Sequence, residues 1–167
     1  MHKGSGTLCW NLIFHDVDKI RYYDGATYII DETGKTSGTT GSTLGSFINI
    51  TTNEPIPEKN GEFAPYLHSV YAHEYGHYLQ SQSSGWAYLF KYGIPSVIDF
   101  HKNKGKTANY LDRNGNVKII GKHSIHDAEI DANKRAAQYF SKKGVLYYND
   151  YDGWNYESKN PTYSSPL

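Results

Sequence analysis

The chain has 167 residues and a formal net charge of zero, and 38% of its residues are hydrophobic. This length fits one domain around one core, and the 16 tyrosines add enough apolar area to exclude disorder over most of the chain. The zero net charge gives no electrostatic reason to expect nucleic acid or an anionic membrane as a partner. We therefore expect one domain over residues 1–167, in which about the first 10 residues belong to a linker.

Cysteine content and hydropathy exclude several further classes of protein. Cys9 is the only cysteine, so an intramolecular disulfide and a zinc cluster built on cysteines are both excluded. No apolar run approaches the ~18 residues that a membrane-spanning helix needs, so we expect no membrane insertion. Residues 1–6 include a lysine, but no apolar stretch follows them, and they do not read as a signal peptide.

The first part of the chain has the pattern of β-strands. Residues 11–31 read as β structure, with Asp24-Gly25 between two strand-prone runs as a strong hairpin signal. Residues 32–46 are rich in glycine, threonine and serine and predict a loop. Residues 46–51 predict a further strand.

Later segments have apolar residues at helical spacing. A helix is predicted over 65–82, starting at a proline, which suits a first helical turn. A second apolar stretch over 86–101 predicts a helix that is bent or broken at 93–95. The last helix is expected over 125–142, with Ser124 as its N-cap.

Two shorter features complete the pattern. Strand-prone residues on both sides of Asn114-Gly115 predict a small hairpin over 110–120. The aromatic and polar segment from residue 145 predicts one strand followed by a surface loop. Strands first and helices later predict an α+β fold, in which a small, mostly antiparallel sheet packs on the first helix with the last helix alongside.

The chemistry is concentrated in residues 73–77, which spell HEYGH and match the motif HExxH. Positions i and i+4 lie on one helix face, so His73 and His77 can bind one tetrahedral metal ion through nitrogens at ~2.0–2.1 Å. Glu74 lies beside such an ion, where a carboxylate can take a proton from metal-bound water and deliver it to the leaving amine. The motif therefore predicts Zn²⁺ as cofactor and Glu74 as general base.

Coincidence is the alternative interpretation of the motif, and the two histidines would then be packing or surface residues. The context argues against coincidence, because the motif lies inside a predicted helix that follows a predicted strand. Gly76 costs ~1 kcal/mol relative to alanine inside a helix. A glycine there makes sense if another element, or the metal site, approaches the helix closely.

A catalytic zinc site needs a third protein ligand and one open position. The candidates are the histidines and acids of the later segments, namely His101, His123, His126, Asp127, Glu129 and Asp131. Glu129 fits best, because it lies on one helical stripe with small alanines, where a charged residue needs a buried partner. A favourable charge at the helix N-terminus is the alternative role for Glu129. His126, one turn earlier, is the alternative ligand, whereas Asp131 lies off the stripe.

These segments resemble a known family. HEYGH followed by EIDANKRA at 129–136 resembles the gluzincin pattern HExxH…ExxA[DN]xxA. More narrowly, HEYGHYLQSQ, LFKYGIPSVI and EIDANKRAAQYF resemble metallopeptidase-like domains at the C-termini of Bacteroidetes Rhs-type and other polymorphic-toxin proteins, over about residues 44–140. By this resemblance Glu129 is the third ligand. Asn133 takes the position where many gluzincins have an aspartate that accepts a hydrogen bond from the first ligand histidine, and its neutral amide would raise ligand basicity less.

The resemblance implies a zincin-like fold and a zinc-dependent endopeptidase that acts on a protein or peptide. It also implies a toxin or effector domain, secreted or delivered as part of a larger protein, with an immunity protein as partner. A zinc hydrolase of a non-protein substrate and an inactive zinc-containing binding domain are the alternatives. The intact Glu74 favours an enzyme, because a structural site has no use for a base beside the metal.

Substrate-binding groups are less well defined by the sequence. His123 and His126 lie near the ligand helix and are the candidates for stabilising an oxyanion. Tyr147, Tyr148 and Trp154 either line a cleft or serve aromatic packing. We expect the strand at 46–51 to border the cleft, with an exposed edge that could bind an extended peptide.

Overall fold

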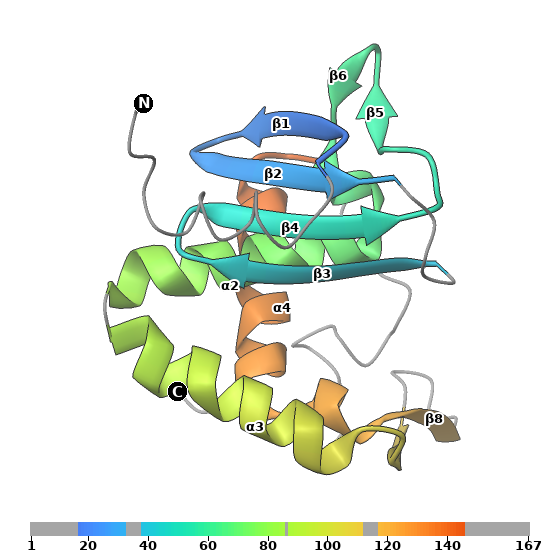
Figure 1. Ribbon diagram of the computed structural model, residues 1–167, viewed down its shortest axis with the longest axis vertical. Helices are drawn as coiled ribbons and strands as arrows, with labels where there is room; N and C mark the ends of the chain where they lie inside the picture. The colour runs from blue at the N-terminus through green and yellow to red at the C-terminus, as the bar shows by residue number, and fades with distance from the viewer. Residues whose placement is uncertain (1–16, 33–37, 86, 112–116, 146–167) are drawn as a thin grey trace.

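The computed structural model describes residues 17–32, 38–85, 87–111 and 117–145 (Figure 1). The expectations for residues 1–16, for Asn114-Gly115 and for the segment beyond 145 lie outside these ranges, as do those for Tyr147, Tyr148 and Trp154. The described part of the chain is an α+β arrangement, in which a small mixed sheet packs on helices.

The main sheet has four strands, β1 (Lys19–Tyr23), β2 (Ala26–Asp31), β3 (Thr39–Leu44) and β4 (Phe47–Thr52). Their order is β1-β2-β4-β3, with β2 and β4 parallel and the other two pairs antiparallel. β1 and β2 form the predicted hairpin. Asp24 and Gly25 take φ angles of 40° and 88°, the positive values that a two-residue turn of this kind requires.

The structure corrects two predictions for this sheet. Residues 39–44 were expected in a loop but form β3, whose polar residues are mostly exposed or half-buried and so lack the apolar alternation that marks a strand. The strand predicted at 46–51 exists as β4, but β4 lies inside the sheet between β2 and β3. The exposed edge was therefore assigned to the wrong strand, because β3 is the edge strand on this side of the described sheet.

Helix α2 (Ser69–Ser84) carries the HEYGH motif and lies against the sheet (Figure 1). It begins at Ser69 rather than at Pro65, because Pro65 opens a separate 3-10 turn, η1 (Pro65–Leu67). His68 is the N-cap, and its Nδ1 accepts a hydrogen bond from the backbone N–H of Val70 at 3.2 Å.

The core fills the space between one face of the sheet and the helices. Alternate residues of β2 and β4 face it, and they are Ala26, Tyr28, Ile30, Ile48 and Ile50. Tyr71 and Tyr75 of α2 and Phe140 pack against them and are also fully buried. Burying an isoleucine or phenylalanine side chain of this set is worth about 1.5–3 kcal/mol. The buried tyrosines show that the tyrosine-rich composition does supply the core.

The second half of the chain supplies the elements α3 (Ile94–Asn103), β7 (Thr107–Leu111), β8 (Val117–Gly121) and α4 (Asp127–Lys142). The irregularity predicted at 93–95 is a π-helical turn, η2 (Leu89–Gly93), that leads directly into α3. β7 and β8 pair antiparallel as predicted. Another small hairpin, of β5 (Glu58–Lys59) and β6 (Glu62–Phe63), precedes η1.

Helix α4 confirms the last predicted helix, but its N-cap is His126 rather than Ser124. A 3-10 turn, η3 (Lys122–Ile125), takes up Ser124 and moves the start of the helix. His126 Nδ1 then accepts a hydrogen bond from the backbone N–H of Ala128 at 3.3 Å. Capping therefore engages one ring nitrogen of His126.

Helices α2 and α4 touch at Gly76. A Cβ atom built on Gly76 would lie only 2.5 Å from the carbonyl carbon of Ala132 in α4, closer than real Cβ contacts. The expectation that another element approaches this glycine is therefore confirmed. Ala132 and Ala136 are fully buried, so small residues line the contact from the α4 side as well.

The substitution Gly76→Ala tests this contact. Helix propensity alone would favour alanine by ~1 kcal/mol, whereas overpacking of this kind costs about 1–3 kcal/mol. Because the clash is with backbone atoms of α4, we expect a net loss of stability in urea unfolding. Gln82→Ala, at an exposed position of the same helix, should be close to neutral. An unchanged or higher urea midpoint of unfolding for Gly76→Ala would show that α2 and α4 can move apart at little cost in free energy.

Candidate metal centre

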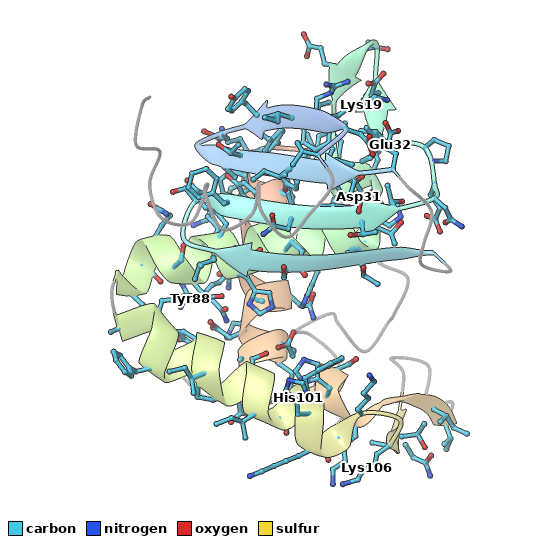
Figure 2. All side chains as sticks on the ribbon, viewed as in Figure 1. Lys19, Asp31, Glu32, Tyr88, His101 and Lys106 are labelled. Carbon is cyan, nitrogen blue, oxygen red and sulfur yellow. The ribbon has the colours of Figure 1, made fainter. Side chains whose placement is uncertain are left out.

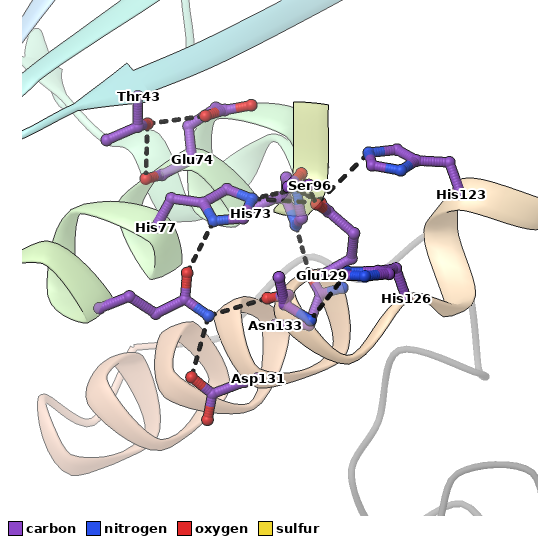
Figure 3. A network of polar contacts seen from close by, with 12 residues as sticks. Thr43, His73, Glu74, His77, Ser96, His123, His126, Glu129, Asp131 and Asn133 are labelled. Atoms are coloured by element: carbon purple, nitrogen blue, oxygen red, sulfur yellow. Dashed lines mark hydrogen bonds and ion pairs between the residues drawn. The ribbon is translucent and has the colours of Figure 1, made fainter. Parts of the chain in front are cut away.

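Three potential metal ligands meet where α2 crosses α4. His73 Nε2 and His77 Nε2 are 3.2 Å apart, and each lies 3.1 Å from Glu129 Oε2 (Figure 3). We call these three atoms the donor triangle. α2 supplies both histidines from successive turns of one face, and α4 supplies the carboxylate from its first turn. The structure thus brings together the three residues that the sequence predicted as ligands, and this group could hold a metal ion.

The size of the donor triangle fits one ion. Ligand atoms at ~2.0–2.1 Å from a tetrahedral ion lie about 3.3 Å from one another. The observed separations of 3.1–3.2 Å come close to this value. A small four-coordinate cation would therefore be accommodated without a large movement of any of the three side chains.

Buried amide groups orient both histidine rings. His73 Nδ1 lies 2.8 Å from Asn133 Oδ1, and His77 Nδ1 lies 2.8 Å from Gln80 Oε1. When each Nδ1 donates its hydrogen to the amide oxygen, each Nε2 presents a lone pair to the donor triangle. Asn133 was expected in this role from the family resemblance. Gln80 was missed, although its position one turn after His77 is a signal that the sequence does contain.

The second carboxylate oxygen of Glu129 is also held in place. Ser96 Oγ of α3 donates to Glu129 Oε1 at 2.6 Å, and His123 Nε2 lies 3.3 Å from the same oxygen. These contacts leave Oε2 to face the histidines. Ser96 lies in no recognisable sequence motif. Its contact with Glu129 depends on how α3 packs against α4, so the sequence did not predict it.

His123 contacts carboxylates through both ring nitrogens. Its Nδ1 lies 2.9 Å from Asp99 Oδ2, and the other Asp99 oxygen accepts a hydrogen bond from Asn103 at 2.7 Å. Asp99 was not among the predicted site residues, because the sequence gives no sign that it would meet a residue 24 positions later.

Glu74 lies next to the donor triangle but outside it. Its side chain is buried, at 5% exposure, and its Oε2 lies 2.7 Å from the hydroxyl of Thr43 in β3. A Cβ atom at Gly41 would lie 2.5 Å from Glu74 Cγ and 2.8 Å from its carboxylate carbon, so the backbone of β3 passes the Glu74 side chain too closely for a larger residue at position 41. The segment expected to be a loop therefore positions the predicted general base.

Charge within the cluster changes the ionisation of its members. Burial alone would lower the pKa of His77, but the charge and hydrogen bond of Glu129, with smaller contributions from Glu74 and Gln80, raise it to about 9. Burial would raise the pKa of Glu129, but His77 and His73 hold it well below its usual range. In the metal-free protein a proton on His77 thus balances the buried carboxylate.

A cleft of about 520 Å³ opens over these residues. Gly41, Ser42 and Thr43 of β3 form one wall, the motif residues form the floor, and α3 and η3 form the other wall. Tyr88 and His101 also line the cleft (Figure 2). His101 does not belong to the donor triangle.

The remaining candidates for third ligand lie elsewhere in the described structure. His126 caps α4, Asp127 is exposed in its first turn, and Asp131 contacts Gln80 and Arg135 rather than the histidines. The geometry therefore favours Glu129 over these alternatives as the third donor.

Comparison of this chain with protein-family models, with curated proteins and with solved structures gives no match. Function is therefore inferred from the site itself. Among the described helices, none combines the length and the apolar character that crossing a bilayer would take.

Metal binding should be linked to proton release. A divalent ion at the donor triangle displaces the proton that His77 holds below its pKa of about 9, so affinity should rise with pH across the neutral range. Calorimetry in buffers of different ionisation enthalpy measures the protons released, and His77→Ala should show neither binding nor release. A zinc affinity that is independent of pH would contradict this assignment.

The same proton on His77 stabilises the metal-free fold. This stabilisation is fully present below the unfolded pKa of 6.5, and it is lost as the pH rises through the folded pKa of about 9.

Proposed function

We propose that this chain is a zinc-dependent hydrolase and that it acts as an endopeptidase of the zincin type. His73, His77 and Glu129 would hold the zinc, and Glu74 would serve as general base. The observation that carries the proposal is the position of Glu74, a buried carboxylate that faces the cleft beside the donor triangle without belonging to it.

The donor set supports a catalytic rather than a structural site. Two imidazoles and one carboxylate are the protein ligands of several zinc hydrolases, which keep a fourth position for water or substrate. Structural zinc sites have four protein ligands. A buried carboxylate beside such a closed site would cost free energy without any compensating role.

Each residue around the cleft then has a chemical task. Bound zinc would polarise the substrate carbonyl and lower the pKa of a water molecule. Glu74 takes a proton from the attacking water as the carbon–oxygen bond forms. When the carbon–nitrogen bond breaks, the same carboxyl delivers that proton to the leaving amine. The hydroxyl of Thr43, at 2.7 Å, keeps the carboxylate turned toward the cleft.

His123 is the better of the two predicted oxyanion stabilisers. Asp99 fixes its ring through Nδ1 at 2.9 Å, and His123 lines the cleft. His126 is not among the residues that line the cleft, and its Nδ1 is engaged in capping α4. We therefore assign to His123 the hydrogen bond that would stabilise negative charge on the carbonyl oxygen, donated by Nε2 in place of its 3.3 Å contact with Glu129 Oε1.

Strand β3 would align an extended peptide. Every second residue of an edge strand turns its backbone N–H and C=O away from the sheet, where another extended chain can pair with them. Gly41, Ser42 and Thr43 expose this strand to the cleft next to Glu74. A peptide substrate is thus favoured over a compact non-protein one. The resemblance extends the proposal to a toxin or effector domain delivered within a larger protein.

The ligand assignment is tested by removing single carboxylates. Glu129→Ala deletes one corner of the donor triangle, so we expect the purified protein to lose most of its zinc, measured by elemental analysis. Asp127→Ala removes a carboxylate from the same helical turn, exposed and outside the triangle, and should keep about one ion per chain. Equal zinc contents in the two variants would place the third ligand elsewhere.

The catalytic assignment is tested by Glu74→Gln. Glutamine keeps the size and helix propensity of glutamate and can still accept from Thr43, so the fold and the zinc should both survive. It cannot act as a base, and losing a positioned base typically removes a factor of ~10²–10⁴ in rate. Cleavage of an unfolded protein such as casein, followed by the release of new amino termini, is the measurement.

The possible outcomes separate the three candidate functions. Casein cleavage by the zinc-loaded wild type, abolished in zinc-loaded Glu74→Gln, supports the endopeptidase. Hydrolysis of other esters or amides but of no peptide, with the same dependence on Glu74, would replace it by a non-peptide hydrolase. No hydrolysis by the zinc-loaded wild type would favour the inactive zinc-containing binding domain, and equal activity in both zinc-loaded proteins would rule out the mechanism through Glu74.

A further inference from the structure

The geometry points to Gln80, held by Asp131, as the positioning residue that fixes His77 for metal binding. This inference rests on the proposed zinc site and adds to it a chain of contacts that leads from the ligand to the protein surface. Gln80 is completely buried, with 0% of its surface exposed, and lies one turn after His77 on α2. Glutamine is rarely buried in this way unless its amide is fully hydrogen-bonded.

The orientation of the Gln80 amide is determined by its partners. One end of the amide lies 2.8 Å from the carbonyl oxygen of Ala128 and 2.9 Å from Asp131 Oδ2. Both partners are acceptors, since a backbone carbonyl and a carboxylate carry no hydrogen to donate. That end must therefore be the NH₂ group, and the other end, which faces His77, must be the oxygen.

The orientation of Gln80 in turn determines the state of His77. The amide oxygen at 2.8 Å accepts a hydrogen bond, so His77 Nδ1 must carry hydrogen. In a neutral ring Nε2 is then the nitrogen with the free lone pair, and Nε2 is the atom in the donor triangle. Gln80 thus selects the one neutral tautomer of His77 that can bind a metal there.

Asp131 extends the chain of contacts outward. Its Oδ2 accepts from Gln80 and also from Arg135 Nε at 2.7 Å, and Arg135 reaches Ser83 Oγ at 3.0 Å. Asp131 and Arg135 are one turn apart on α4, whereas Gln80 and Ser83 are on α2. The same contacts that orient the amide therefore also join the two ligand-bearing helices. Asp131, although it lies off the ligand stripe, would thus act on the metal site indirectly, through Gln80.

Gln80→Met is the first test, because methionine matches the length of glutamine but replaces its amide with a thioether, which is only a weak acceptor and has no hydrogen to donate. Removing such a partner of a ligand histidine typically weakens metal affinity 10–100-fold. We expect a loss of this size in zinc affinity, measured by competition with a chromophoric chelator. Gln82→Met, two residues later at an exposed position, is the matched control and should bind zinc like the wild type.

A spectroscopic measurement separates positioning from a general loss of stability. In the zinc-loaded protein the Nδ1–H of His77 should give a slowly exchanging imidazole signal by NMR. We expect this signal in wild type, Gln82→Met and Glu74→Gln, and its loss or rapid exchange in Gln80→Met. Unfolding curves of the metal-free variants show that each is folded under the conditions of the titration.

A double-mutant cycle tests the link through Asp131. If Asp131 acts through Gln80, Asp131→Ala should weaken zinc binding less than Gln80→Met does, and the double variant should bind no more weakly than Gln80→Met alone. Additive losses would show that Asp131 acts independently. Unchanged affinity in a folded Gln80→Met, together with loss of zinc in His77→Ala, would overturn the positioning role while keeping the zinc site. Zinc retained in His77→Ala would overturn the zinc site itself.

Discussion

The close contact of α2 and α4 at Gly76 is the constraint on which the site depends. Neither helix carries the donor triangle alone, because α2 supplies two imidazoles and α4 supplies the carboxylate. Glu129 lies one turn before Ala132, the residue whose carbonyl group meets Gly76. The distance between the helices therefore sets the distance between the donors. A larger side chain at position 76 would push α2 and α4 apart and would thereby also separate the histidine donors from Glu129.

The buried polar groups around this contact satisfy one another. Glu129 uses one oxygen for the two histidines and the other for Ser96 and His123. Both histidines donate to neutral amide oxygens rather than to carboxylates. The negative charge within the donor triangle consequently comes from Glu129, and Glu74 adds negative charge beside it. Such a network is costly if one member is lost, since an unpaired buried polar group destabilises by about 1–3 kcal/mol.

The two walls of the cleft have different origins. β3 comes from the sheet and holds Glu74 through Thr43, whereas α3 comes from the second half of the chain and holds Glu129 through Ser96. Glu74 and Glu129 are thus each fixed by a wall of the cleft. This arrangement leaves the space between the walls for the substrate of the proposed hydrolase. It also explains why Gly41 is tolerated in the middle of a strand, because a side chain there would collide with Glu74.

Local patterns in the sequence determined the helices, the Asp24-Gly25 hairpin and the two histidines of one helix face. These features depend on residues three or four positions apart, or on a single tight turn, and the chain shows them directly. The alanine stripe of α4 also pointed to Glu129. Only the tertiary structure decided that polar residues 39–44 form the edge strand and that Ser96, Asp99 and Gln80 reach the site. A half-exposed edge strand carries no apolar alternation, and hydrogen bonds between distant segments leave no periodic trace, because their partners are chosen by packing.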